Sequence, residues 1–157
     1  MKYNYLNIYN NLIKLTRNKK LYLNLEKEDT FSERLIFLFF HLALFLKHFK
    51  TSIHAKNLQE LFDFIIRQIE LSIREIGYGD ASINKKMKTY INTFYSILSK
   101  IDNWENLADK DKGDLLKSFF NINDEIIHLS KYFDKYRLFL IKSSLNSFIK
   151  GVVKPEF

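Results

Sequence analysis

Hydrophobic side chains recur along this chain with the period of an α-helix. The clearest stripe lies between residues 58 and 76, at Leu58, Phe62, Ile65, Ile69, Ile73 and Ile76. Because residues three or four positions apart lie on the same face of a helix, this stripe predicts an amphipathic helix. Its polar side carries Asp63, Arg67, Glu70 and Arg74, whose spacing predicts a ladder of ion pairs.

A second stripe of the same period follows at Ile83, Met87, Tyr90, Ile91, Phe94, Ile97 and Leu98. The two stripes are separated by the segment Gly77-Tyr78-Gly79-Asp80. Gly77 can adopt the left-handed conformation that ends many helices, and Asp80 or Ser82 can cap the helix that follows. The pattern therefore predicts a helical hairpin.

Residues 35–46 are apolar except for His41. This run is shorter than the about 20 residues that a helix needs to span a bilayer. Thr30 and Glu33 have the spacing of a capping box, so we expect a helix to begin there. A helix that is apolar on all sides is either the centre of the core or the floor of a binding groove. For His41 the alternatives are a core imidazole held by one hydrogen bond and a functional side chain.

The remaining segments are less regular. We expect a first helix over residues 3–16, a polar loop over 102–113 with one turn around Trp104, a short helix over 114–120 and a long helix over 124–150. With 157 residues, 4 glycines and 1 proline, the chain is predicted to be all-α. The predicted architecture is a single-domain bundle of about six helices over residues 1–157, with the hairpin at its centre.

The chain is basic, with 25 Lys and Arg against 18 Asp and Glu and a formal net charge of +7. Lysine far outnumbers arginine, and Asn, Ile, Phe and Tyr are abundant, which is the residue set of A/T-rich codons. The charge alone is therefore weak evidence for a nucleic-acid partner. The absence of cysteine excludes disulfides, thiolate metal sites and a cysteine nucleophile.

No set of residues in the sequence completes a catalytic or metal site. Glu125-x-x-His128 is half of the pattern used by helical di-iron proteins, but there is no second copy. The other histidines, His41, His48 and His54, are scattered, and no serine is marked by a motif. We therefore predict no enzyme activity, no metal and no cofactor.

Three lysines near the start of the second hairpin helix conflict with its dipole. Lys85, Lys86 and Lys88 fall in the first two turns predicted for this helix. Positive charge there costs roughly 0.3 to 1 kcal/mol for each residue. Either nearby acids, Glu70, Glu75 or Asp80, offset these charges, or the lysines face an external anion.

Four segments of the predicted hairpin form a distinctive set: Leu61-Phe62-Asp63, Arg74-Glu75-Ile76-Gly77-Tyr78-Gly79-Asp80, Lys85-Lys86-Met87-Lys88 and Phe94-Tyr95. The set continues upstream in Leu21-Tyr22, Asp29-Thr30, Arg34 and His41. Together these segments resemble the ubiquinol-cytochrome c chaperone family. The similar region covers about residues 20–150 and is most specific over residues 58–98.

The resemblance implies an all-α assembly chaperone of the respiratory ubiquinol-cytochrome c reductase that binds newly made cytochrome b and has no enzyme activity. It also implies a small helical partner protein, the ribosome and the surface of the inner membrane as partners. Because the first 25 residues do not resemble a transit peptide, we expect a bacterial cytoplasmic chain at the inner face of that membrane, without a transmembrane segment. The resemblance assigns partner binding to Arg74, Glu75, Gly77, Gly79, Asp80, Lys85, Met87, Lys88, Phe94, Tyr95 and His41.

Three functions are compatible with these sequence features. In the first, a groove lined by Phe37, Phe40, Leu44 and the isoleucine stripe holds an apolar helix, while Lys85 and Lys88 meet its polar flank. In the second, the same lysines bind phosphate in an RNA- or ribosome-binding module. In the third, a helical bundle binds a quinone or haem, which requires a sizeable internal cavity.

Overall fold

The computed structural model describes residues 3–23, 30–120, 127–155 and 157, and within these ranges the chain is helical without any strand. The all-α prediction is confirmed. The α-helices are α1 (Tyr5–Thr16), α2 (Phe31–Phe49), α3 (Ala55–Ile76), α4 (Asp80–Lys100), α5 (Asp109–Lys117), α6 (Ile127–Lys142) and α7 (Leu145–Lys150). A 3₁₀ helix, Lys19–Tyr22, follows α1, and another, Ile101–Asn106, lies between α4 and α5.

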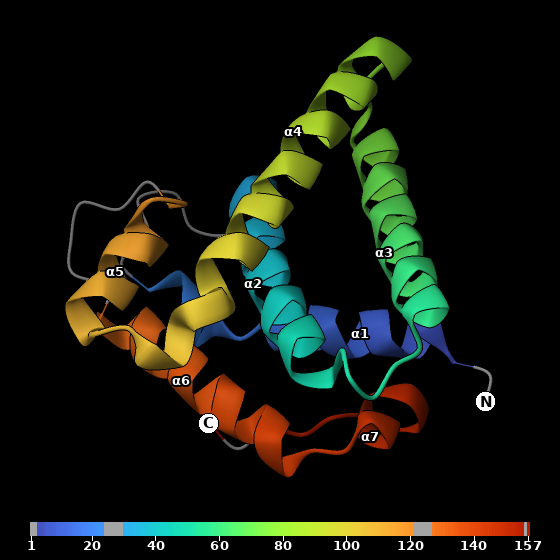
Figure 1. The fold of residues 1–157 in the computed structure, drawn as a ribbon. Helices are drawn as coiled ribbons and strands as arrows, with labels where there is room; N and C mark the ends of the chain where they lie inside the picture. Colours follow the sequence, from blue (N-terminus) through green and yellow to red (C-terminus); the bar gives the residue numbers. More distant parts are fainter. Residues whose placement is uncertain (1–2, 24–29, 121–126, 156) are drawn as a thin grey trace.

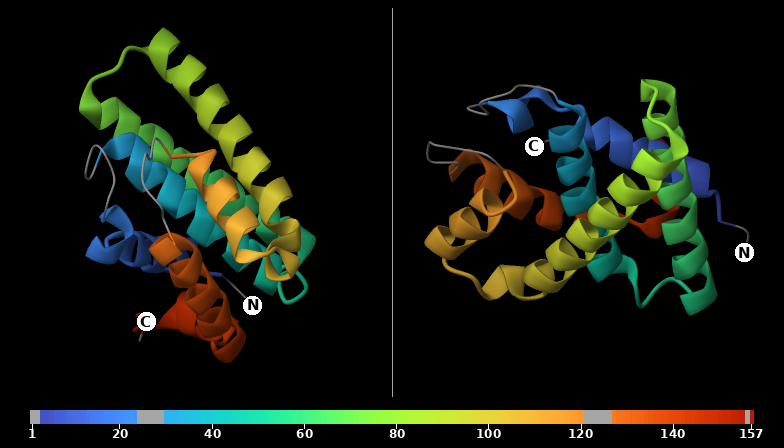
Figure 2. Two further views of the ribbon diagram at one scale, coloured as in Figure 1. Left: turned by 90° about the vertical axis from the view of Figure 1, so that its left-hand side faces the viewer. Right: turned by 90° about the horizontal axis from the view of Figure 1, so that it is seen from above.

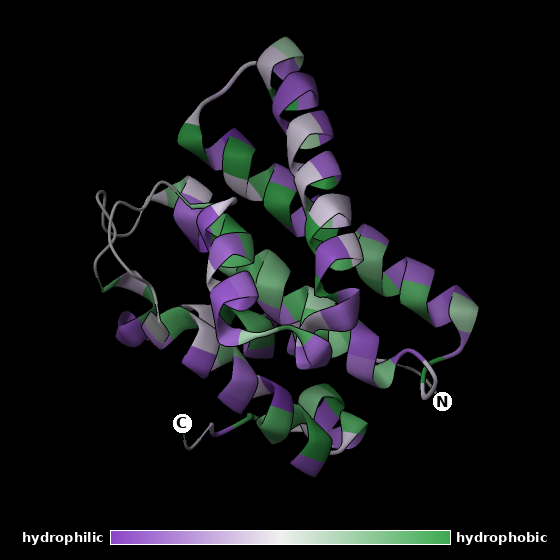
Figure 3. Cartoon of the chain, turned by 60° about the vertical axis from the view of Figure 1, so that its left-hand side comes forward, coloured by the Kyte–Doolittle hydropathy of each residue, from purple (hydrophilic) through white to green (hydrophobic). Residues whose placement is uncertain are grey.

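Helix α2 is the centre of the hydrophobic core and contacts α1, α4 and α6 (Figures 1 and 2). It begins at the predicted capping box, in which Thr30 accepts from the backbone N–H of Glu33. Figure 3 shows apolar and polar colour alternating along the outer helices. No helix in the part of the chain described here is both long and apolar enough to cross a membrane.

The burial of α2 decides between the two interpretations of its apolar run. Phe37 and Phe40 are completely buried and Leu44 is 2% exposed. The prediction of a core helix is confirmed. The prediction of an open groove lined by these three side chains is wrong, because neighbouring helices cover every side of α2 that carries them.

Helices α3 and α4 form the predicted hairpin, and their turn projects beyond the rest of the molecule (Figure 1). Gly77 ends α3 with φ 105°, a left-handed conformation that favours glycine. Each helix starts three residues earlier than its apolar stripe, α3 after the N-cap His54 and α4 after the N-cap Gly79. The inward stripe is buried, at Leu61, Ile65, Ile69, Ile73, Ile83, Met87, Phe94 and Ile97.

The C-terminal third departs from the expected helices. The short helix α5 begins at Asp109, and the predicted long helix over 124–150 is broken between α6 and α7. At the break, Ser143 donates its hydroxyl to the carbonyl of Phe139, and Ser144 caps α7 by accepting from the N–H of Ser147. Serine side chains that bond to nearby main chain compete with helix continuation in this way.

Trp104 lies in the 3₁₀ helix that was expected as a turn, and it is completely buried. Its indole Nε1 donates to Oδ1 of Asp134 on α6 at 2.9 Å. The ammonium of Lys112 on α5 lies 2.9 Å from the same oxygen. A nearly buried lysine is thus neutralised by a carboxylate, which fixes α5 and the 3₁₀ helix against α6.

Two asparagines of α1 hold the C-terminal segment. Asn11 is buried; its amide donates to the carbonyls of Phe148 and Gly151 and its oxygen accepts from the N–H of Val153. Asn7 donates to the carbonyls of Phe148, Ile149 and Gly151. These bonds satisfy main-chain carbonyls that the end of α7 would otherwise leave unpaired.

Candidate functional site

The residues selected from the sequence gather on the α3–α4 hairpin, with one exception. The positions on α3, α4 and their turn are Arg74, Glu75, Gly77, Gly79, Asp80, Lys85, Met87, Lys88, Phe94 and Tyr95. His41 lies apart from them on α2. The hairpin is therefore the candidate site, and its charged, apolar and buried parts have different roles.

A chain of ion pairs braces the turn of the hairpin. Arg74 bridges Glu70, at 3.1 Å, and Asp80, at 2.6 Å, so the end of α3 is joined to the first residue of α4. Arg67 completes the chain at 3.0 Å from Glu70. Hydrogen bonds from Arg74 and, to a smaller extent, from Arg67 lower the pKa of Glu70. The predicted ladder is confirmed from Arg67 onward, whereas Asp63 accepts from Gln59 instead.

The lysines of α4 lie farther from its N-terminus than the sequence predicted. Because α4 begins at Asp80, Lys85 and Lys88 occupy its second and third turns, beyond the first turn where the dipole acts most strongly. The expected dipole cost is correspondingly smaller.

The acids expected to offset these lysines are partly engaged elsewhere, since Arg74 and Arg67 bind Glu70 and Arg74 also binds Asp80. Lys85 and Lys88 are exposed, and neither forms an ion pair within the described ranges. The ammonium of Lys86 lies 4.4 Å from the ring centre of Tyr78, a cation–π contact across the turn. Lys85 and Lys88 are thus free to meet an external anion.

Apolar side chains are also exposed on the hairpin. Leu71, Ile76 and Tyr78 are exposed near the turn, and Tyr95 is 53% exposed farther along α4. The ring of Tyr95 stacks on Phe62 at 5.8 Å. These exposed apolar side chains are available for contact with another molecule.

Two of the selected residues face inward. Phe94 is 1% exposed, and its ring lies 5.3 Å from Phe39 and 5.6 Å from Phe62, which joins the hairpin to α2. Met87 is 8% exposed and borders the space between α3 and α4. Phe94 therefore supports the hairpin rather than offering a contact surface.

His41 is completely buried and lies outside the hairpin surface. Its Nδ1 lies 2.6 Å from the carbonyl oxygen of Phe37, and its Nε2 lies 2.7 Å from the hydroxyl of Tyr132. Burial lowers its pKa to about 4. The interpretation as a core imidazole fits this position, with two hydrogen bonds rather than one. Its assignment to a partner-binding surface is wrong for this structure because no part of the side chain reaches the exterior.

Hollows flank α3 that the sequence pattern did not reveal. The hollow between α3 and α4, of about 380 Å³, is lined in part by Ile66, Met87, Lys88 and Ile91. The unpaired Lys88 is one of the polar or charged side chains in its wall, and the others are Glu70, Asn84 and Asn92. This combination suits an apolar segment with a polar or acidic flank.

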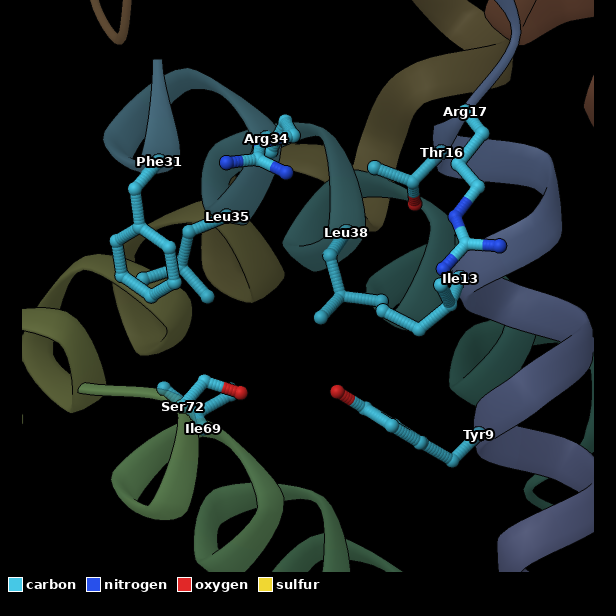
Figure 4. Close-up of a pocket in the computed structure, with 10 residues that line it drawn as sticks. All are labelled: Tyr9, Ile13, Thr16, Arg17, Phe31, Arg34, Leu35, Leu38, Ile69 and Ser72. Atoms are coloured by element: carbon cyan, nitrogen blue, oxygen red, sulfur yellow. The ribbon is translucent and has the colours of Figure 1, made fainter. Parts of the chain in front are cut away.

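The second hollow, of about 230 Å³, lies between α1, α2 and α3. Figure 4 shows the hydroxyls of Tyr9 and Ser72 facing each other across it, with Leu38 above and Arg17 at the rim. Burial raises the pKa of Tyr9, while Ser72 and Arg17 oppose that increase. The volume is below the about 300 to 1,000 Å³ typical of cofactor sites, which disfavours the quinone- or haem-binding alternative here.

The metal fragment noted in the sequence remains untested, because Glu125 lies outside the described residues. Within the described ranges, no three His, Cys, Asp or Glu side chains cluster in a way that could hold a metal ion.

Fold and site together define an all-α protein whose candidate site is an exposed helical hairpin. The sequence matches the family described as Ubiquinol-cytochrome C chaperone over residues 24–121, which include the whole hairpin, and the chain belongs to this family. The resemblance inferred from the hairpin segments is confirmed. The family is defined by a chaperone role, not by a catalytic reaction.

The fold is similar to a solved structure, the crystal structure of the Cbp3 homolog from Brucella abortus. The TM-score is 0.77 with 22% sequence identity, and the match covers 98% of this chain and 88% of that chain. At this identity the likeness shows a shared fold. No curated protein matches the sequence.

Proposed function

We propose that this chain binds newly made cytochrome b and assists its entry into the ubiquinol-cytochrome c reductase, using the outer surface of the α3–α4 hairpin. The family supports the chaperone role. The main support for the proposal is that one projecting hairpin contains three features together. These are the family-like segments, exposed apolar side chains and the unpaired Lys85 and Lys88. The chain acts at the cytoplasmic face of a bacterial inner membrane, with a small helical partner protein and the ribosome as further partners.

The chemistry of a membrane-protein client suits this surface. A membrane-spanning helix has a stretch of about 20 predominantly apolar residues. Ile66, Met87 and Ile91 give the client an apolar contact in the hollow between α3 and α4. The rest of its lining is polar or charged, from Glu70, Asn84, Lys88 and Asn92. Because the residues first assigned to a groove on α2 are buried, the contact surface moves to the outside of the hairpin.

The test compares recovery of nascent cytochrome b by the native chain and by variants. Lys85→Glu/Lys88→Glu should lower recovery, because it reverses the charge beside the hollow. Ile76→Ser/Tyr78→Ser should lower it by removing exposed apolar surface near the turn. Lys110→Glu/Lys117→Glu makes the same charge change on exposed residues of α5 and should leave recovery unchanged. Native recovery by both hairpin variants would refute the proposal.

The second candidate function is binding of RNA or the ribosome, which the unpaired Lys85 and Lys88 favour. Salt separates the two functions. Each phosphate contact on a single strand contributes about −0.7 to the slope of log affinity against log salt, whereas apolar contacts contribute little. Binding of an RNA oligonucleotide that weakens with this slope and disappears in Lys85→Glu/Lys88→Glu would favour the second function.

A further inference from the structure

The outer face of α6 combines lysines with exposed aliphatic side chains. Lys131, Lys135, Leu138, Ile141 and Lys142 are all exposed, and Leu138 and Ile141 are each 51% exposed. Their spacing of three or four residues places them on neighbouring positions of one helical face. We call these five residues the α6 basic face.

The positive charge of this face is not balanced by α6 itself. The only acidic side chain within Ile127–Lys142 is Asp134. It is turned toward α5, where it accepts from the indole of Trp104 and the ammonium of Lys112. Lys131, Lys135 and Lys142 form no ion pair within the part of the chain that the structure describes.

The C-terminal segment extends the same surface. Lys135, Leu138 and Lys142 line a shallow hollow of about 520 Å³ together with Lys154 and Phe157. The ring of Phe157 is held by contacts with Tyr132, at 5.1 Å, and with Phe139, at 5.5 Å. The hollow therefore has an aromatic floor fixed to the core and a rim of lysines.

The α6 basic face is distinct from the candidate client surface. Figure 1 and the left view of Figure 2 both show α6 at the end of the molecule remote from the turn between α3 and α4. A role for α6 therefore does not depend on the proposed function of the hairpin.

We propose that the α6 basic face binds the anionic surface of a lipid bilayer. The lysines contact lipid phosphates, and Leu138 and Ile141 enter the boundary between head groups and acyl chains. Charge complementarity favours this occupant, since cationic side chains surround a small aliphatic centre on a helix lying along the surface.

The experiment measures co-sedimentation of the full chain with vesicles. Vesicles of equal parts phosphatidylglycerol and phosphatidylcholine should bind the native chain, and vesicles of phosphatidylcholine alone should bind it much less. Each lysine near an anionic surface contributes about fivefold in partitioning. Lys135→Glu/Lys142→Glu should therefore lower partitioning at least about 25-fold. Leu138→Ser/Ile141→Ser should also weaken binding while leaving its salt dependence unchanged.

A matched control is the hairpin variant Lys85→Glu/Lys88→Glu, which carries the same charge change elsewhere and should bind anionic vesicles as the native chain does. All substituted side chains are exposed, and far-UV circular dichroism checks that each variant is folded. The proposal is overturned if the native chain ignores anionic vesicles, if Lys135→Glu/Lys142→Glu binds them normally, or if the hairpin control loses binding equally. Client recovery by the α6 variant should stay native, so this test is separate from that of the hairpin.

Discussion

The imidazole Nε2 of His41 on α2 accepts a hydrogen bond from the hydroxyl of Tyr132 on α6 across 2.7 Å of the core. The direction of this bond follows from the other ring nitrogen. Nδ1 faces the carbonyl of Phe37 at 2.6 Å, and because a carbonyl only accepts, Nδ1 carries the hydrogen. Burial lowers the pKa of His41 to about 4, so the ring is neutral near pH 7. The neutral ring links the central helix to α6.

The His41 imidazole should make stability depend on pH. Its pKa is about 4 in the folded chain and 6.5 when exposed, so between these values the unfolded chain binds a proton that the folded chain does not. Acidification through this window should therefore remove stability, about 3 kcal/mol when complete. The pKa values of His48 and His128 are also lowered by burial, so they act in the same direction.

Nuclear magnetic resonance isolates the contribution of His41. Its imidazole signals should show no titration between pH 8 and about 5, unlike those of an ordinary histidine. A midpoint near 6.5 for His41 would contradict its buried, neutral state.

Tyr132→Phe should destabilise the fold by about 1 to 3 kcal/mol, because it leaves the buried Nε2 of His41 without a donor. Denaturant unfolding followed by the fluorescence of Trp104, the single tryptophan, measures this change. Tyr95→Phe is the matched control, since its side chain is half exposed, and it should change stability by less than about 0.5 kcal/mol. Equal stability of Tyr132→Phe and the native chain would show that this hydrogen bond does not stabilise the fold.

Gly77→Ala and Gly79→Ala should have different effects although the residues are two positions apart. Alanine at residue 77 must adopt a φ of 105°, which costs about 1 to 2 kcal/mol. At residue 79 the φ is −75° and no atom obstructs a Cβ, so the poorer N-cap and the less flexible unfolded chain offset each other within about 0.5 kcal/mol. Thermal unfolding of both variants tests this, and a larger loss from Gly79→Ala would contradict the left-handed conformation of Gly77.

Asn11→Ala should lower the free energy of unfolding by about 2 to 3 kcal/mol, since the N–H of the buried Val153 then loses its acceptor. The carbonyls of Phe148 and Gly151 keep their bonds to Asn7, which limits the loss. Asn10→Ala removes the same side chain from an exposed position of α1 and should change stability little. Chemical denaturation of the two variants should therefore separate them clearly.

The parts of the fold that local pattern determines were predictable. The isoleucine stripe on α3, the left-handed Gly77 and the capping box at Thr30 each depend on residues close in sequence, and each was confirmed. The break between α6 and α7 was missed because Leu140, Ser144 and Phe148 keep a helical period through it. The period does not reveal that Ser143 bonds to the main chain of α6 or that Ser144 caps the start of α7.

The parts that depend on distant residues were not predictable. The Tyr132 partner of His41 lies 91 positions away, and no spacing rule connects them. The apolar run of α2 fitted both a core and a groove, and only the packing of α1, α4 and α6 around it decided between them. The α6 basic face was missed because the orientation of Asp134 toward Trp104, which leaves the lysines unbalanced, is a tertiary fact.

The clamp between Asn11 and Val153 has a consequence for the order of events during synthesis. The two residues are 142 positions apart, so the side chain of Asn11 cannot complete its hydrogen bonds until residue 153 has been synthesised. Domains generally fold as units once their contacting segments are available. The body of this molecule therefore closes late, and a product truncated before residue 153 would leave the first helix without its anchor. Synthesis of residues 148–153 is therefore a condition for closing the packing of α1 against the C-terminal segment.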